Sequence, residues 1–165
     1  MIIVELVLFT LISLFSIISI SGLGKFFINR INRNFFESFF CGFIVISFLL
    51  SFLHFFIKID FYISLSIFLF GFILALKNFK FSTIIINKKY IAYLLIFLIL
   101  IPMYISQKYH EDFGYYHLPY ILNFVDEKII FGLANSNKAF VHNSIWLNIL
   151  PFFYIKDNYN LVTLP

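Results

Sequence analysis

The side chains that could do chemistry in this sequence gather in one stretch, residues 110–143. Three of the four histidines and four of the eight acidic residues lie in it. Glu111 and Asp112 are adjacent, and His110 directly precedes them. Two neighbouring carboxylates can supply a general base, hold a cation, or remain solvated charge in a loop, and a base needs a pKa near the working pH. A second carboxylate and partial burial would both raise that pKa. Spacing alone favours interfacial charge, but any catalytic group is expected here.

The same stretch holds polar side chains that could bind a substrate. His142 could contact an anionic headgroup, although a surface histidine is the simpler interpretation. Residues 132–140 have the composition of a turn-rich connector, so turn formation explains Asn135 as well as binding does. Asn143 could equally cap the apolar segment that follows it. The candidate substrate-binding residues are His110, Tyr116, His117, Asn135, His142 and Asn143. No set of protein metal ligands is predicted.

A short amphipathic helix is expected inside this stretch, over residues 118–127. The apolar side chains follow the i, i+3, i+4, i+7 spacing of one helix face. Pro119 suits the first helical turn. Tyrosine rings nearby are suited to a bilayer surface. The stripe consists of Leu118, Ile121, Leu122 and Val125, and the tyrosines are Tyr115, Tyr116 and Tyr120. We therefore expect a helix lying on the outer leaflet.

The composition around this stretch is that of an integral membrane protein. Of the 165 residues, 62% are hydrophobic and only 12% are charged, whereas a soluble domain has roughly 45–50% apolar and 25% charged residues. The formal charge of +4 comes from short basic clusters between apolar runs, which determine topology rather than bind nucleic acid. The single cysteine, Cys41, excludes an intramolecular disulfide.

Four apolar runs are candidates for transmembrane helices, each near the length of about 20 residues that crosses a bilayer. They are residues 2–23, 35–57, 61–76 and 90–106. Gly22 and Gly24 are expected to end the first. His54 lies one turn before the end of the second, where reaching interfacial water is favoured over an intramembrane functional role. Pro102 falls in the last turns of the fourth, where a kink is tolerated.

The basic residues predict the orientation. The connectors at residues 24–34 and 77–89 contain seven lysines and arginines, and the positive-inside rule places them in the cytoplasm. The N-terminus and the loop from residue 107 are then extracytoplasmic, together with Lys58. Residues 1–106 form the transmembrane part, residues 107–143 the outer loop, and residues 144–165 the start of a fifth apolar helix. The predicted fold class is an all-α polytopic membrane protein, and we expect it to be the N-terminal part of a longer chain.

The outer loop resembles that of a known enzyme class. The order of an acidic residue after a span, then D-F-G-Y-Y-H-L-P, I-I-F-G-L-A-N and H-N-S-I-W, is similar to the first large outer loop of multi-span bacterial proteins related to the GT-C class of membrane glycosyltransferases. The resemblance covers residues 111–146. It departs from the class in that three further spans precede the loop here, whereas the class commonly has one span before it.

The resemblance implies transfer of a sugar from a polyprenyl-phosphate donor to an acceptor of the cell envelope, at the outer face of the bacterial plasma membrane. It implies Asp112 as the catalytic base or acceptor-orienting residue, with Glu111 beside it. His110 and His117, together with Lys108 or Lys138, could stabilise the leaving phosphate. Some members of the class require a divalent cation and others do not. The expected partners are membrane lipid and the lipid-linked sugar, and nucleic acid is not among them.

Two other classes of function compete with this one. The chain could be a non-enzymatic polysaccharide or lipid transporter or flippase subunit, but such proteins favour ionisable residues or helix breaks at mid-membrane, and the centres of these spans are almost free of charge. It could also be a structural membrane fragment without activity. An enzymatic role is therefore an expectation that rests on the resemblance.

Overall fold

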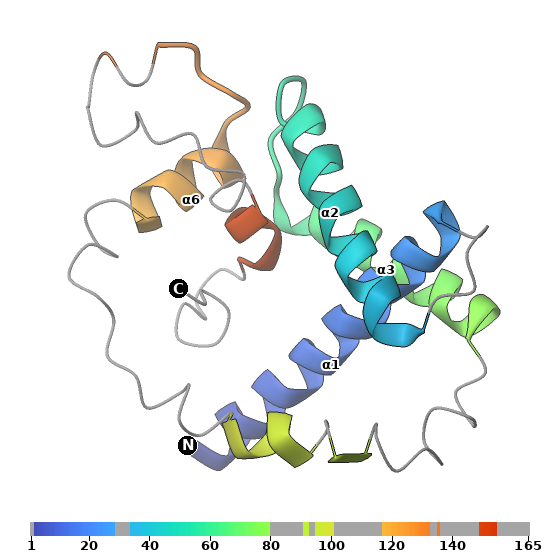
Figure 1. Cartoon of the computed structure of the whole chain (residues 1–165). Helices are drawn as coiled ribbons and strands as arrows, with labels where there is room; N and C mark the ends of the chain where they lie inside the picture. The colour runs from blue at the N-terminus through green and yellow to red at the C-terminus, as the bar shows by residue number, and fades with distance from the viewer. Residues whose placement is uncertain are drawn as a thin grey trace. The chain divides into compact units, whose positions relative to one another are not determined.

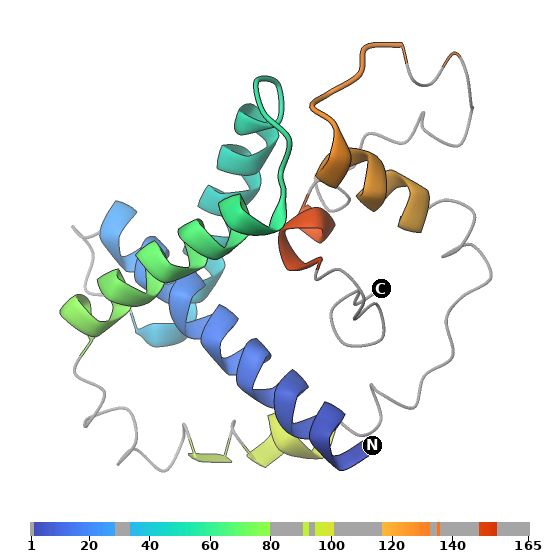
Figure 2. The ribbon, with the colours of Figure 1, turned by 180° about the vertical axis from the view of Figure 1, so that it is seen from behind.

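The structure is a computed structural model, and it describes residues 2–28, 34–79, 91–92, 95–100, 117–132, 135 and 149–154. Every regular element in this part is helical, as Figures 1 and 2 show, and no strand occurs among these residues. The predicted all-α fold class is confirmed. The elements are α1 (Ile2–Phe27), α2 (Phe35–Leu53), α3 (Phe61–Asn78), α6 (Leu118–Asp126) and the 3-10 helix η3 (Leu150–Phe153).

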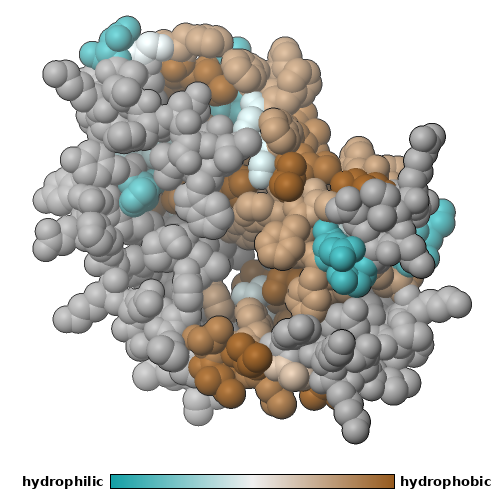
Figure 3. Space-filling view, viewed as in Figure 1, coloured by the Kyte–Doolittle hydropathy of each residue, from teal (hydrophilic) through white to brown (hydrophobic). Residues whose placement is uncertain are grey.

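Three of these helices are long and apolar enough to cross a bilayer. The candidate spans are Val7–Phe27, Phe35–Leu53 and Phe61–Asn78. The face shown in Figure 3 is mostly hydrophobic wherever it is described, as expected for a surface in contact with acyl chains. The chain is an integral membrane protein. The fourth predicted span lies largely outside the described residues, although residues 91–92 and 95–100 within it are helical.

The sequence predicted that the first helix ends at Gly22 and Gly24, and this prediction is wrong. α1 continues through Gly22 and Gly24 to Phe27, and both glycines are buried. A Cβ atom on Gly24 would overlap the backbone of Ser38 in α2, and one on Gly22 would overlap the Gly71 carbonyl oxygen in α3. The glycines therefore permit close approach of helix backbones, which is how small residues act in membrane interfaces.

The reciprocal positions on α2 and α3 are glycines as well. A Cβ on Gly42 would overlap the Ile20 carbonyl oxygen of α1, and one on Gly71 would overlap that of Ser19. Ser19 and Ser21 are fully buried, and their hydroxyls donate to carbonyl oxygens four residues earlier, at 2.8 and 2.7 Å. No serine hydroxyl of this pair is thus left unsatisfied in the bilayer. These contacts belong to one compact unit, Met1–Phe43 with Phe68–Lys108.

The ends of α2 and α3 are fixed by local capping. The Asn34 side chain accepts from the Glu37 amide at 3.0 Å, and the Glu37 carboxylate accepts from Asn34 in return, which is a capping box. Asp60 accepts from the Ile63 amide at 3.1 Å and so caps α3. α2 ends at Leu53 rather than at the predicted residue 57, which leaves residues 54–60 as the α2–α3 connector.

Candidate functional site

The α2–α3 connector is hydrogen-bonded to α6 and to the residues that follow it. The Ile59 amide donates to the Phe124 carbonyl oxygen at 3.1 Å, and the Ile129 amide donates to the His54 carbonyl oxygen at 3.0 Å. All four residues belong to the second compact unit, Ile44–Ile67 with Tyr109–Pro165. Two backbone bonds therefore attach the C-terminal end of α6 to the connector that joins two membrane helices.

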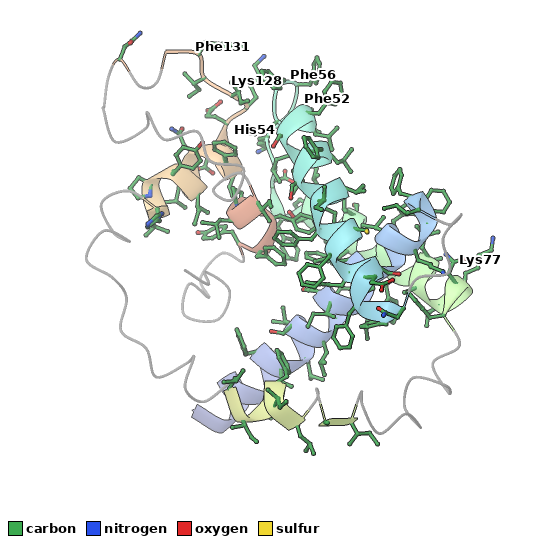
Figure 4. The ribbon with its side chains drawn as sticks, viewed as in Figure 1. Phe52, His54, Phe56, Lys77, Lys128 and Phe131 are labelled. Carbon is green, nitrogen blue, oxygen red and sulfur yellow. The ribbon has the colours of Figure 1, made fainter. Side chains whose placement is uncertain are left out.

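The side chain of His54 completes this attachment. It is only 2% exposed, and its ring lies on that of Phe124 with centroids 3.7 Å apart and planes inclined by 13°. Its Nε2 is 3.0 Å from the Glu127 carbonyl oxygen. A carbonyl oxygen can only accept, so Nε2 carries the proton and Nδ1 of the neutral ring does not. Nδ1 is buried and has no hydrogen-bond partner among the described residues. Figure 4 shows His54 at the end of α2, facing the segment that carries Lys128.

Burial sets the protonation state of this histidine. Desolvation lowers the pKa of His54 below its ordinary value, and this effect outweighs the carbonyl oxygens of Glu127 and Phe124, which raise the pKa. When α6 is attached to the connector, which we call the docked state, the neutral imidazole is therefore favoured. Protonation would place a charge and a second N–H donor at Nδ1, a buried atom that forms no hydrogen bond among the described residues.

We expect the docking of α6 to weaken in acid. Because the docked pKa lies below the ordinary value of 6.5, the undocked state binds more protons in the window just below that value. The contribution of His54 to docking is then fully present above pH 6.5 and is lost as pH falls toward the docked pKa. Hydrogen exchange at the Ile59 and Ile129 amides, corrected for intrinsic rates, measures this at about pH 7.5 and about pH 5. In His54→Phe the acid-induced increase in the exchange rate should disappear. An equal increase in that variant would assign the effect to another group.

The apolar stripe of α6 is covered by protein. The helix itself confirms the prediction, with bounds Leu118–Asp126 and Pro119 in its first turn. Ile121 forms a buried cluster with Leu150 of η3 and with Tyr154, and Leu122 and Val125 pack against that cluster. Figures 1 and 2 show η3 lying against α6. At these positions the stripe packs against Leu150 and Tyr154, whereas the sequence predicted that it lies on the outer leaflet.

The Tyr120 ring packs inside the protein, whereas the sequence predicted that it faces the bilayer surface. Its side chain is buried, and its ring stacks on Phe124 with centroids 4.7 Å apart. Burial raises the pKa of the Tyr120 phenol. Tyr120 and Phe124 therefore form a second, aromatic face of α6, and this face packs against His54.

Of the predicted site residues, the structure describes two. His117 is the half-buried N-cap of α6, and its side chain forms no capping hydrogen bond. Asn135 is exposed, and its amide donates to the Gly132 carbonyl oxygen at 2.8 Å, which confirms a turn there. No hydrogen bond within the described part joins these two residues. The predicted residues outside the described part are His110, Glu111, Asp112, Tyr116, His142 and Asn143.

The described residues also bear on ion binding. Among them, no three histidine, cysteine or acidic side chains group closely enough to hold a metal ion. The one ion pair formed within this part joins Lys58 to Asp60 at 4.0 Å, and both side chains are partly exposed. Such a pair stabilises little at a surface.

The environment predicted for His54 is wrong. Exposure to interfacial water was expected, but the side chain is buried under α6. The partner is 70 positions away in the sequence, so no local pattern identifies it. The signal that was present is the aromatic pair Tyr120 and Phe124, spaced four residues apart beside the aliphatic stripe, which indicates a second packed face.

The chain belongs to a family described as "Domain of unknown function (DUF8201)", which matches residues 1–160. No curated protein and no solved structure matches the chain significantly. The family covers the three spans, the connector and α6 together. The described contacts of His54 and of the glycines thus lie within a single family domain.

Proposed function

We propose that this protein is a membrane glycosyltransferase related to the GT-C class, acting at the outer face of the bacterial plasma membrane. In this proposal Asp112 is the base that removes the proton from an acceptor hydroxyl. The acceptor oxygen attacks the sugar carbon that bears the phosphate, and the polyprenyl phosphate leaves with the bonding electron pair. Glu111 lies beside the base in the sequence.

The observation that carries the proposal is the attachment of α6 to the α2–α3 connector. Two backbone hydrogen bonds and the buried His54 hold α6 at the end of a membrane-spanning helix. Asp112 is six residues before Leu118, the first residue of α6. Even a fully extended chain of that length reaches only about 20 Å. In this proposal Asp112 acts near the bilayer surface, the level at which a lipid-linked phosphate lies.

Charge distribution supports the sidedness. The positive-inside rule assigns the α2–α3 connector and the loop at residues 107–143 to the same side, opposite the basic connectors at residues 24–34 and 77–89. The hydrogen bonds between Ile59 and Phe124 and between Ile129 and His54 join these two segments. An assignment that put them on opposite sides would be incompatible with those bonds. The bonds support a shared side for the two segments, and the positive-inside rule alone favours the extracytoplasmic side for both.

His117 is the described residue best suited to assist the leaving group. It stands at the N-cap of α6, is half-buried, and does not use its imidazole for capping. It is five positions after Asp112. A histidine near a developing phosphate charge can donate a hydrogen bond to it, and such preorganised donors contribute strongly to transition-state stabilisation.

Replacing Asp112 with asparagine tests the proposal. Asparagine keeps the size of the side chain but cannot accept a proton, so sugar transfer should fall by about 10²- to 10⁴-fold, the usual contribution of a general base. The measurement is transfer of radiolabelled sugar from polyprenyl-phosphate donors in membrane vesicles, with the amount of inserted protein determined in parallel.

Asp126→Asn is the matched control, because it makes the same substitution at an exposed carboxylate outside the candidate site and should retain full activity. Full activity in Asp112→Asn would remove this residue from the mechanism. Wild-type vesicles that transfer no sugar from any polyprenyl-phosphate donor tested would contradict the enzymatic assignment itself.

A further inference from the structure

The segment after α6 exposes a strongly apolar tip. Phe131 is 82% exposed, more than any other large hydrophobic side chain among the described residues, and Ile130 before it is also exposed. Neither residue belongs to a spanning helix. Removing such a side chain from water is favourable in proportion to the apolar area that is buried. A pair of them held outward therefore indicates an apolar environment around the tip.

The tip is continuous with the lipid-facing surface of α2. Exposed side chains recur every four residues along one face of that helix and into the turn after it. They are Ile44, Phe48, Phe52 and Phe56, between 56% and 65% exposed. The Phe131 ring lies 6.3 Å from that of Phe55, the neighbour of Phe56 in the turn. Figure 4 shows Phe52 and Phe56 on α2 and its turn, with Phe131 at the same end.

The backbone holds the tip in this position. The Ile129 amide donates to the His54 carbonyl oxygen at 3.0 Å, which fixes the chain two residues before Phe131. Gly132 follows with φ of 82°, a conformation that side chains on L-residues disfavour. The Asn135 amide closes the turn on the Gly132 carbonyl oxygen. The apolar residues thus project from a turn that is fixed on both sides.

We propose that residues 129–131 insert into the acyl-chain region of the bilayer beside the end of α2 and anchor α6 at the membrane surface. The occupant of this surface is lipid. Continuity with the exposed face of a spanning helix supports this choice. Lys128 is exposed directly before the tip, where its ammonium group can reach the phosphate level while its stem follows the apolar surface. Asp126 and Glu127, which directly precede Lys128, are exposed and mark the aqueous side.

Tryptophan fluorescence measures the depth of the tip. The sequence has a single tryptophan, Trp146, so Phe131→Trp is made in a Trp146→Phe background and the full chain is placed in lipid vesicles. With lipids brominated on the acyl chains, the indole introduced by Phe131→Trp should lose most of its emission, whereas iodide in the buffer should quench it weakly. The matched control is Glu127→Trp in the same background, which should show the reverse pattern.

Each alternative outcome contradicts the anchor. Strong iodide quenching without bromolipid quenching at position 131 would place the tip in water. Protection from both quenchers would show that protein, from a partner or a second copy, covers it. Ile130→Trp repeats the measurement at the adjacent exposed position and must give the same pattern as Phe131→Trp, so that a folding defect of one variant does not decide the result. The experiment does not depend on sugar transfer.

Discussion

Replacing His54 with alanine is expected to release α6 from the α2–α3 connector. The substitution removes the ring that stacks on Phe124 at 3.7 Å and the hydrogen bond to the Glu127 carbonyl oxygen, and it leaves a cavity where a side chain is 2% exposed. A lost hydrogen bond of about 1 kcal/mol, a lost ring pair of about 0.5–1.5 kcal/mol and the cavity together amount to roughly 2–4 kcal/mol. The equilibrium between docked and undocked α6 should therefore shift by roughly 30- to 1,000-fold.

Hydrogen exchange of the full chain in lipid reports this equilibrium directly. The Ile59 and Ile129 amides are protected by bonds that exist only when α6 is docked, so both should exchange faster in His54→Ala by a similar factor. His54→Phe keeps an aromatic ring on Phe124 but not the hydrogen bond, and should give an intermediate effect.

Phe56→Ala is the matched control, because Phe56 lies two residues away and its side chain is exposed. Its exchange at the two amides should equal that of the wild type. Unchanged protection in His54→Ala would show that the two backbone bonds and the η3 contacts hold α6 without the histidine. A rise in only one of the two amides would show that the attachment is not a single cooperative contact.

This contact shows which parts of the site sequence reasoning could reach. The amphipathic spacing and Pro119 predict α6 correctly because they are local properties of one helix. The burial of His54 depends on a partner 70 positions away, and its exposure at the end of a span was the more economical interpretation. No residue of the connector indicates that His54 is buried, since a histidine near the end of a span commonly reaches interfacial water.

In the spanning helices, too, local properties are predicted from the sequence and contacts between distant residues are not. Length and hydrophobicity predict α1, α2 and α3 because a bilayer imposes both on any helix that crosses it. The function of Gly22 and Gly24 was misassigned because glycine has two uses in a helix, as a terminator and as a point of close approach. Only the neighbours decide between these uses. The neighbours are Ser38 and Gly71, which no periodicity within α1 reveals.

A substitution at Gly71 separates these two uses of glycine by the sign of its effect. In terms of helix propensity, Gly71→Leu should stabilise α3 by about 1 kcal/mol, because glycine is a poor helix former. In terms of packing, the new side chain would meet the Ser19 carbonyl oxygen and Leu23 of α1. Overpacking usually costs about 1–3 kcal/mol, and the upper end applies here because backbone must move. We expect net destabilisation and separation of α1 from α3.

The midpoint of unfolding in mixed micelles of increasing dodecyl sulfate, followed by helical circular dichroism, measures this change. Ser66→Leu is the matched control, since it introduces the same side chain into the same helix at an exposed position. Its midpoint should stay at the wild-type value or rise slightly, while that of Gly71→Leu should fall, and Gly71→Ala should lie between them. If Gly71→Leu were as stable as Ser66→Leu, the close approach at Ser19 would not contribute to the folded state. The α1–α3 crossing would then have to be held elsewhere, for example by Phe15 against Phe68 and Phe72.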